Sequence, residues 1–413
     1  MLLNSYIVEL SKCHNMSQNA YIFNQLCSLL PRDHFEYLVK KHNANYHVRS
    51  YTCWNHLMVM LWAQLTHRDS LRDIEAGLRA HGEKLYRLGM GKSVNKSTMS
   101  YANTNKEVAV FRELAQKMME LASRAAGVKN GELGKLAGVL ELAGVFAVDS
   151  STVNLDLKRF GWSVPQEGMG GIKLHTMYDV MREVPALCLV TGHEERDQTF
   201  MDDYPYMKGG LYVFDRAYVK TPSLKRIDDG GAYFIVRRKK GMEYRCLSNT
   251  GSECLPVYGD KRVEFTNRWA RKGYPGQLRL VQYYSKERNE VMDFLTNNFQ
   301  MSPMVVACAY KNRWSIELFF RWIKRHLIIN RFYGTSANAV FTQVYVAITA
   351  YCLVAMAGAM YRFKGSAYEL MSVLSVILFE KQDLSEVIRR YENHSEEKAQ
   401  MPCWPTLFDT MDF

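Results

Sequence analysis

The pattern of apolar and polar positions changes twice along the chain, and its first part is typical of helices. From residue 1 to about residue 140 the polar side chains are largely basic and the apolar ones fall in helix-length runs. Residues 52–65 predict a strongly apolar helix. Ser70, with Asp73 three residues later, resembles a capping box that opens a second helix over 71–80.

A third helix of this part begins at Ser97 and is expected to run to about Ala126. It follows a loop that contains glycine and lysine, and the residues around its start include Ser, Thr, Tyr, Asn and Lys. Two helices, a turn and a third helix with such a polar start are typical of domains that read the major groove of DNA. An ordinary helical bundle with a solvated basic face fits the same pattern.

After the glycine-rich stretch 127–136 the pattern changes to short apolar runs, which predict strands. The run 145–148 leads directly to Asp149, and the run 210–214 leads directly to Asp215. Each aspartate is therefore expected at the end of a buried strand. An aspartate in such a place is also a common turn residue or helix cap.

The remaining elements of this middle part predict a mixed α/β sheet. Two strands of an antiparallel meander, a short helix, a second helix and a further strand are expected at 173–178, 186–190, 197–207, 221–229 and 232–236. A polar, arginine- and glycine-rich insertion follows, with strands expected at 263–266, 278–284 and 291–295. A long helix then begins at about Val305.

The pattern changes for the second time after this helix, because residues 339–360 carry no charge at all. Such a run is long enough to span a bilayer, but threonines, a glutamine, two tyrosines and a glycine dilute it. We therefore expect a helix buried inside the protein, without a membrane partner. Amphipathic helices are expected at 368–379 and 384–391, and the tail from Glu392 is expected to be loosely held.

The long helix carries a stripe of distinctive side chains. On a regular helix Tyr310, Arg313, Glu317 and Lys324 lie within roughly a 60° arc. A lone carboxylate among cations is typical of a surface salt-bridge ladder, or of a divalent metal site beside a phosphate backbone that the cations grip. The side chains on the opposite, packing side are Phe319, Trp322 and Ile323.

Composition indicates which kind of partner and which cellular compartment to expect. The 413 residues carry a net charge of +11, with 47% hydrophobic residues, enough for a sizeable core and for two or three domains. The positive charge favours a polyanionic partner. The nine cysteines form no Cys-x-x-Cys pair, so a zinc site or disulfide framework is not expected. With no signal-peptide pattern at the N-terminus, a reducing cytosol fits.

Asp149, Asp215 and Glu317 are the candidate catalytic and metal-binding residues. Three converging carboxylates repel one another unless cations neutralise them. Two Mg²⁺ ions roughly 3.5–4 Å apart would do so, and would activate a water or a 3′-hydroxyl for in-line attack on a phosphodiester. Oxygen-only ligands favour Mg²⁺ over zinc, with Mn²⁺ able to substitute.

The pattern Tyr310-x2-Arg313-x3-Glu317-x6-Lys324 resembles the Tyr-Arg-Glu-Lys signature of bacterial insertion-sequence transposases of the IS-four family. That family belongs to the Asp-Asp-Glu transposases, and the spacing matches without departure. Other blocks also resemble the family, including the two aspartate blocks, a Lys-x-His pair, and segments before and after the glutamate helix. These are 148–152, 213–218, Lys173 with His175, 294–298 and 330–335.

The resemblance implies an α/β RNase H-like catalytic core over 141–334, interrupted by a β-strand insertion at about 240–302. It further implies an α-helical N-terminal DNA-binding domain over 1–140 and a helical C-terminal region over 335–413. The order of strands and helices in the middle part is similar to that of retroviral integrases and transposases.

The resemblance also assigns roles to single residues. It implies that Tyr310, Arg313 and Lys324 contact DNA near the cut end. Lys173 and Arg216 are further candidate DNA-binding residues, although Lys173 fits a solvated side chain as well. Two side chains stay open: His175 is either a proton shuttle or a satisfied strand histidine, and Trp269 is a candidate for holding a flipped base, which no motif aligns.

The sequence thus predicts a metal-dependent DNA transposase that cleaves the terminal inverted repeats of an insertion sequence and transfers the strands to target DNA. Its predicted partners are double-stranded DNA, as ends and as target, and a second copy in a homodimeric synaptic complex. The predicted location is the bacterial cytoplasm, on the nucleoid when DNA is bound. A nuclease of the same fold and a DNA-binding protein with an inactive site are the alternatives, and inverted repeats flanking the gene would favour transposition.

Overall fold

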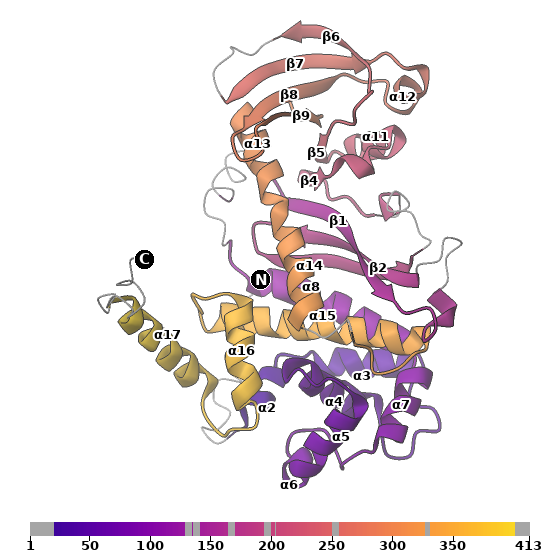
Figure 1. The fold of residues 1–413 in the computed structure, drawn as a ribbon, viewed down its shortest axis with the longest axis vertical. Helices are drawn as coiled ribbons and strands as arrows, with labels where there is room; N and C mark the ends of the chain where they lie inside the picture. The colour runs from indigo at the N-terminus through magenta and orange to yellow at the C-terminus, as the bar shows by residue number, and fades with distance from the viewer. Residues whose placement is uncertain are drawn as a thin grey trace, which may run out of the picture.

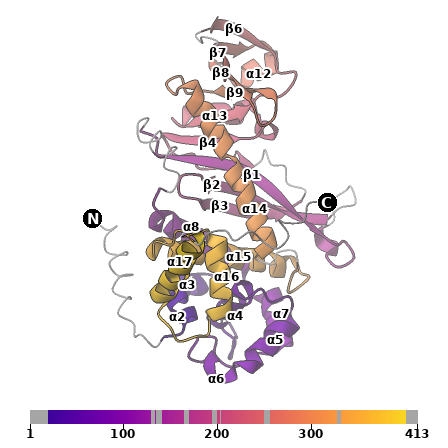
Figure 2. The same ribbon diagram turned by 60° about the vertical axis from the view of Figure 1, so that its left-hand side comes forward.

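Helices occupy one end of the molecule and a nine-stranded sheet occupies the other (Figure 1). The structure is a computed structural model that describes residues 20–128, 134, 141–163, 170–193, 200–202, 204–249, 256–326 and 331–400. Two helices, α13 (Pro303–Asn312) and α14 (Trp314–His326), run along the molecule from the sheet toward the helical end (Figures 1 and 2).

The described part of the N-terminal region is helical, as predicted. Its helices are α2 (Ile22–Cys27), α3 (Arg32–Lys41), α4 (Cys53–Leu65), α5 (Leu71–Ala80), α6 (Gly82–Leu85), α7 (Lys96–Asn105) and α8 (Val108–Ala125). Thr52 and Asn55 form a capping box at the start of α4. The side chain of Ser70 accepts from the amide of Asp73 at the start of α5, where the sequence predicted a helix start.

The prediction of one long helix from Ser97 is wrong, because the chain forms α7 and α8 there. Lys106 adopts an extended conformation with φ −74° and ψ 137°, which ends α7. The side chain of Glu107 then accepts from the amide of Ala109 and caps α8. The first turn of a helix has amides without a partner inside the helix, and the Glu107 side chain satisfies one of them. This cap stabilises the start of a separate helix at α8.

The sheet has the strand order β3-β2-β1-β4-β5-β9-β8-β7-β6. The strands are β1 (Gly144–Leu155), β2 (Gly170–Asp179), β3 (Val184–Gly192), β4 (Gly210–Phe214), β5 (Tyr233–Arg237), β6 (Tyr244–Asn249), β7 (Val257–Phe265), β8 (Leu278–Ser285) and β9 (Glu290–Thr296). The first three form the predicted antiparallel meander, and β4 pairs in parallel with both β1 and β5. Helix α11 (Thr221–Asp229) connects β4 to β5. The predicted helix at 197–207 is wrong over 204–207, which are not helical, and 197–199 and 203 lie outside the described residues.

Strand β1 continues beyond Asp149, so the prediction that this aspartate ends a strand is wrong. Parallel pairing with β4 stops at Val148 and Phe214, while antiparallel pairing with β2 continues to Leu155. The longer partner strand therefore keeps the chain extended after the shorter one has ended. Since β4 does end directly before Asp215, both aspartates lie just past the last parallel pair.

The insertion contributes β6 to β9, which extend the core sheet. Three of these strands match the sequence prediction, but β6 is almost entirely exposed and lacks the apolar alternation that would have revealed it. Arg279 and Asp260 form a buried ion pair with N–O distances of 2.7 and 2.6 Å. Arg279 also donates to the carbonyls of Asn298 and Met301, just before α13. The insertion thereby fixes the start of α13.

The predicted long helix is in fact two helices, because α13 ends at Asn312 and α14 begins after Arg313. The amide of Ile316 bonds to the carbonyl of Arg313 only three residues back, so the turn is tightened. The side chain of Asn312 donates to the carbonyl of Cys308, and the hydroxyl of Ser315 donates to the carbonyl of Asn312. These side-chain bonds compete with the regular helical bonds and account for the break.

The uncharged segment forms α15 (Ala337–Met360), and the structure buries 89% of its most apolar window inside the protein. Helix α15 packs against α4, α8 and β3, and also against α16 (Ala367–Ile377), which is followed by α17 (Leu384–Gln400) (Figure 2). The prediction of a helix buried in the protein is therefore confirmed. Side chains of α4, α8, α15 and α16 share one core with β1 to β3, so helices from both ends of the chain form a single helical body.

Candidate active site

Three carboxylates, which we call the carboxylate cluster, lie on neighbouring elements. Asp149 is on β1, Asp215 follows β4 directly, and Glu317 is in the first turn of α14. Because β1 and β4 are parallel and in register up to Val148 and Phe214, the two aspartates point to the same face of the sheet. Helix α14 packs against β1 and β2 and brings Glu317 to that face.

Arg313 links two members of the carboxylate cluster. Its Nη1 donates to Oδ2 of Asp149 at 2.8 Å, and its Nη2 donates to Oε1 of Glu317 at 2.5 Å. The side chain of Arg313 is only 12% exposed. The contact from Arg313 to Glu317 is therefore not part of a surface ladder along one helix, because the same guanidinium crosses to β1.

Tyr310 and Lys324 also contact the sheet. The hydroxyl of Tyr310 donates to Oδ1 of Asp215 at 3.3 Å, and its ring lies 4.5 Å from that of Phe294. Burial, together with the charge of Asp215, raises the pKa of Tyr310 to about 12, so the phenol stays a donor at neutral pH. Lys324 donates to the carbonyl of Thr152 on β1 at 2.6 Å, and burial lowers the pKa of Lys324.

The opposite side of α14 packs, as predicted. Phe319 and Trp322 contact Tyr351 of α15 with ring centroids 5.0 and 4.6 Å apart, and Phe319 also lies 5.2 Å from Tyr178 of β2. Ile323 is fully buried. Helix α14 is thus held between the sheet and α15, which fixes the direction in which Glu317 points.

Burial and neighbouring charges shift the ionisation of Asp149. Burial raises the pKa of Asp149 to about 6, against the lowering effect of Arg313 and of the amide of Ser150, while Asp215 and Glu317 raise it further. The carboxylates therefore sense one another's charge. Such mutual repulsion is what a bound cation would relieve.

The chemistry of these donors fits a hard divalent cation, because all three supply carboxylate oxygens. Within the part of the chain that the structure describes, however, no three His, Cys, Asp or Glu side chains are arranged so that they could hold a metal ion. The guanidinium of Arg313 is instead bonded to both Asp149 and Glu317.

Lys173 and His175 lie away from the carboxylate cluster. Asp149 pairs with Thr176 across β1 and β2, and side chains alternate along a strand, so Lys173 and His175 belong to the other face of the sheet. The Nε2 of His175 lies 2.9 Å from Oγ1 of Thr191. These contacts favour the satisfied strand histidine over the proton shuttle, and the role of Lys173 stays a prediction.

Two further predicted residues are exposed. Arg216 directly follows Asp215 in a short 3-10 helix, Arg216–Tyr218, at the edge of the carboxylate cluster. Trp269 is 78% exposed on α12 (Arg268–Gly273) of the insertion, where Asn267 caps the helix. Neither is brought into contact with the carboxylates, so both stay predictions.

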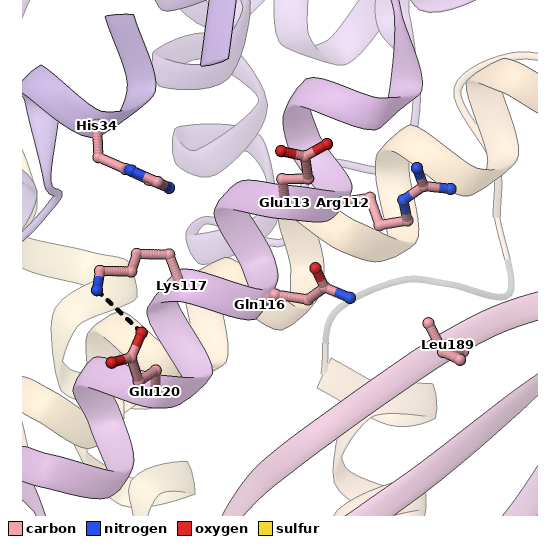
Figure 3. A pocket seen from close by; sticks show the side chains of 7 residues that line it. All are labelled: His34, Arg112, Glu113, Gln116, Lys117, Glu120 and Leu189. Carbon is pink, nitrogen blue, oxygen red and sulfur yellow. Dashed lines mark hydrogen bonds and ion pairs between the residues drawn. The ribbon is translucent and has the colours of Figure 1, made fainter. Parts of the chain in front are cut away.

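The residues of a cavity of about 640 Å³ are not among the predicted site residues. It lies where α3, α8 and β3 approach one another, and its lining pairs basic with acidic side chains (Figure 3). Lys117 and Glu120 form an ion pair of 2.9 Å there, and burial together with Lys117 lowers the pKa of His34. Since the charges neutralise one another, the carboxylate cluster remains the better candidate for chemistry on DNA.

Two models of known protein families match this chain. A family model described as a transposase DDE domain matches residues 141–353, about half of the chain, and includes the whole carboxylate cluster. The chain belongs to the DDE transposase family. A second model, described as a domain of unknown function (DUF4372), matches residues 18–91.

Three proteins similar to this transposase carry matching names. "Putative transposase y4zB" of Sinorhizobium fredii is 27% identical over 302 residues, which is 72% of this chain and 81% of that protein. "Probable transposase for insertion sequence element IS5377" of Geobacillus stearothermophilus is 29% identical over 216 residues, 50% of this chain and 54% of that protein. "Putative transposase for insertion sequence element IS4SA" of Synechocystis is 25% identical over 273 residues, 64% of this chain and 72% of that protein.

These findings confirm the predicted resemblance to insertion-sequence transposases, and with it a DNA-cleaving and strand-transfer enzyme. The DDE transposase family generally uses divalent metal ions. A solved piggyBac transposase synaptic complex with hairpin DNA is similar with a TM-score of 0.45 and 10% identity, over 95% of this chain and 88% of that one. That likeness is too distant to say how the present transposase cuts DNA.

Sequence reasoning missed residues that hold the site's elements in place. Asn297 donates to Oδ1 of Asp228 at 2.7 Å and to the carbonyl of Ala232 at 2.9 Å, and it accepts from the amide of Phe234. It therefore ties β9 to α11 and β5. The only sequence signal was its place in the block 294–298, whereas nothing in the sequence marked the Arg279 ion pair.

Proposed function

We propose that this transposase moves its element by cut-and-paste: it cleaves DNA at the terminal inverted repeats and joins the freed ends to a target. The observation that carries the proposal is the carboxylate cluster, two aspartates just past adjacent parallel strands with a glutamate that shares a cation with one of them. Asp149, Asp215 and Glu317 would hold two Mg²⁺ ions, or Mn²⁺ in their place. The metals would polarise the phosphodiester and lower the pKa of the attacking water or 3′-hydroxyl.

The cations around the carboxylate cluster would hold the DNA backbone. A guanidinium matches a phosphate with two parallel hydrogen bonds, so Arg313 and the exposed Arg216 suit phosphates beside the cut. Lys324 and Tyr310 would contact the backbone on the same side. Lys173 would contact DNA that passes the other face of the sheet.

The region 1–140 would recognise the element's ends, ahead of a catalytic core at 141–334 and a helical region at 335–413. Helix α7 offers the polar surface for this, because Ser97, Ser100, Tyr101 and Thr104 are exposed along it, with Tyr101 71% exposed. Exposed hydroxyl groups and an aromatic ring on one helix suit contacts with base edges in the major groove.

A reaction with the full-length protein tests the cut-and-paste proposal. Linear DNA carrying both ends of the element, incubated with Mg²⁺ and a target plasmid, should yield an excised fragment with double-strand breaks at both ends, followed by insertion products. Insertion products that keep the donor flanks attached would contradict cut-and-paste. The proposed homodimer should appear as two protein copies per pair of ends in sedimentation, and the protein should fractionate with the bacterial cytosol and nucleoid.

The role of α7 is tested in the full-length protein, because α4 and α8 share their core with α15. Tyr101→Ala should weaken binding to the element's end more than binding to unrelated DNA, and affinity for the end should fall steeply with salt. Tyr86→Ala, which changes a tyrosine that is 84% exposed and lies outside α7 in the helical N-terminal region, is the matched control. Equal losses for both variants on both DNAs would count against α7 as the reading helix.

A further inference from the structure

We infer that Arg313 is an internal counter-ion that keeps Asp149 and Glu317 from metal until a DNA phosphate draws it away, so that DNA and divalent metal bind cooperatively. This inference rests on the proposed function of the carboxylate cluster as the metal site. It concerns the state of the transposase before DNA arrives.

Both oxygens of Asp149 and the oxygen of Glu317 that faces Arg313 are already bonded. Oδ2 of Asp149 accepts from Arg313, and its Oδ1 accepts from the amide of Ser150 at 2.8 Å. Oε1 of Glu317 accepts from the second terminal nitrogen of Arg313. A metal ion can take the facing oxygens of both carboxylates only after the guanidinium has left.

Arg313 is largely buried and carries a permanent positive charge, because a guanidinium stays protonated in proteins. A fixed positive charge within bonding distance of both carboxylates neutralises part of their attraction for a second cation and repels that cation directly.

Arg313 lies at the break between two helices. It occupies the tightened turn between α13 and α14, where side chains of Asn312 and Ser315 replace regular helical bonds, and such a turn in a long helix is a common place for a hinge. A DNA phosphate offers the guanidinium the same two-pronged acceptor that the two carboxylates offer now. Lys324 has no equivalent position, because it donates to a backbone carbonyl.

A coupling of this kind is reciprocal. If a phosphate that takes Arg313 raises the affinity for metal, then metal must raise the affinity for DNA by the same factor. The transposase without DNA would then hold metal weakly and become ready for chemistry only on a bound end.

The test measures Mn²⁺ binding to the full-length protein without DNA, from the electron paramagnetic resonance signal of free Mn²⁺. Arg313→Gln should bind Mn²⁺ at least about tenfold more tightly than the wild type, because it removes the competing charge but keeps a polar side chain. Arg321→Gln changes an exposed cation of the same helix that contacts Trp314, and it should leave the affinity unchanged. A duplex of the element's end should tighten Mn²⁺ binding to the wild type by a similar factor and to Arg313→Gln by much less.

Two outcomes separate this inference from the proposed function. If Asp149→Asn with the end duplex binds Mn²⁺ as the wild type with the duplex does, the carboxylate cluster is not the metal site and the proposed function falls. If Asp149→Asn with the duplex loses Mn²⁺, but Arg313→Gln without DNA binds Mn²⁺ no more tightly than the wild type without DNA, only the counter-ion role falls. Should Arg313→Gln fail to fold, Arg313→Lys replaces it, because lysine keeps the charge but lacks the planar fork that now bonds both carboxylates, and it should give an intermediate gain.

Discussion

The carboxylate cluster beside α14 is only partly buried, with the Glu317 side chain 32% exposed, whereas the helical body around α15 is closed to solvent, and the two are stabilised in different ways. The helical body excludes water with apolar side chains, and seventeen consecutive or nearly consecutive positions of α15 from Ala339 to Ala357 are buried. The carboxylate cluster instead contains charges that are balanced by Arg313 and by neutral donors such as Tyr310.

In this transposase the helical body accounts for stability, and the carboxylate cluster is the candidate for the chemistry. Apolar burial contributes to stability in proportion to area, whereas buried charges cost desolvation energy that their pairing offsets only in part. Variants of the helical body should therefore lower the free energy of unfolding, and variants of the carboxylate cluster should abolish cleavage with little loss of stability.

The largest effect should come from the carboxylate cluster. Glu317→Gln keeps the size of the side chain but removes the charge a metal needs, and it should reduce cleavage of end DNA by about a thousandfold or more while leaving DNA binding nearly intact. Asp149→Asn and Asp215→Asn should do the same, and a double variant should be no worse than a single one, because the three act as a unit. Single-turnover cleavage and gel-shift titrations measure the two properties.

The matched control is Glu287→Gln, which removes an exposed ion pair with Lys311 of α13 and should cleave like the wild type. Near wild-type cleavage by Glu317→Gln would show that the contact with Arg313 is only structural, and the proposed catalytic role would fall.

The next largest effect should come from the helical body. Leu353 on α15 is fully buried, so Leu353→Ala should lower the free energy of unfolding by about 2–5 kcal/mol through lost burial and a new cavity. Cleavage per folded molecule should not change. Val376→Ala on α16, whose side chain is 79% exposed, should have little effect in the same denaturant titration. Equal losses in both variants would mean that α15 is not the centre of the core.

A smaller effect should follow pH. Burial, with a smaller contribution from Lys106, lowers the pKa of His56 on α4 to about 3. A histidine whose pKa is lower in the folded state destabilises it as pH falls below the unfolded value of about 6.5, because the unfolded chain then binds more protons. His56 should account for about 2 kcal/mol of lost stability between pH 7 and pH 5.

His56→Gln should remove that part of the pH dependence in urea titrations at the two pH values, whatever its effect at pH 7. If the variant keeps the full loss between pH 7 and pH 5, His56 is not the group responsible, and burial in the helical body is less complete than its contacts indicate.

The smallest effect should be on salt dependence. Arg313→Ala and Lys324→Ala should each lower the slope of log affinity for end DNA against log salt by about one unit, because each loses one phosphate contact. Arg390→Ala, an exposed cation of α17, is the control and should leave the slope unchanged. Unchanged slopes for both site variants would mean that these cations serve the carboxylates and the sheet alone.

Much of the fold could be predicted because local signals were strong. Helix α11 and strand β4 have the bounds that the sequence predicted, since a proline near the start of the helix and a glycine after its end mark α11, and an uninterrupted apolar run marks β4. The buried α15 was predictable from its length and dilution by polar residues. The apolar side of α14 followed from helical spacing alone.

The rest depended on contacts between distant residues. The break at Arg313 depends on side chains of Asn312 and Ser315 that bond to carbonyls, and no periodicity reveals it. The continuation of β1 past Asp149 depends on its partner β2 being longer than β4.

The candidate site shows the same limit. Its three carboxylates could be proposed from strand ends and a helical stripe, but the position of Arg313 between two of them could not. Helical spacing predicts which residues lie on the same face of a helix. It does not predict which residues of other elements those side chains contact. The contact to Asp149 comes from a strand that lies far away in the sequence.

The shared core of the two chain ends also has a consequence for synthesis. The backbone of Ile22 and Phe23 bonds to Glu380 and Leu378, and α8 packs against α15. During synthesis, the N-terminal helices leave the ribosome long before these C-terminal partners, so their apolar faces stay exposed until the partners are made. A nascent chain that stops before α15 would therefore expose apolar helix faces and be prone to aggregation. The shared core can form only after α15 and the residues around Leu378 have been translated.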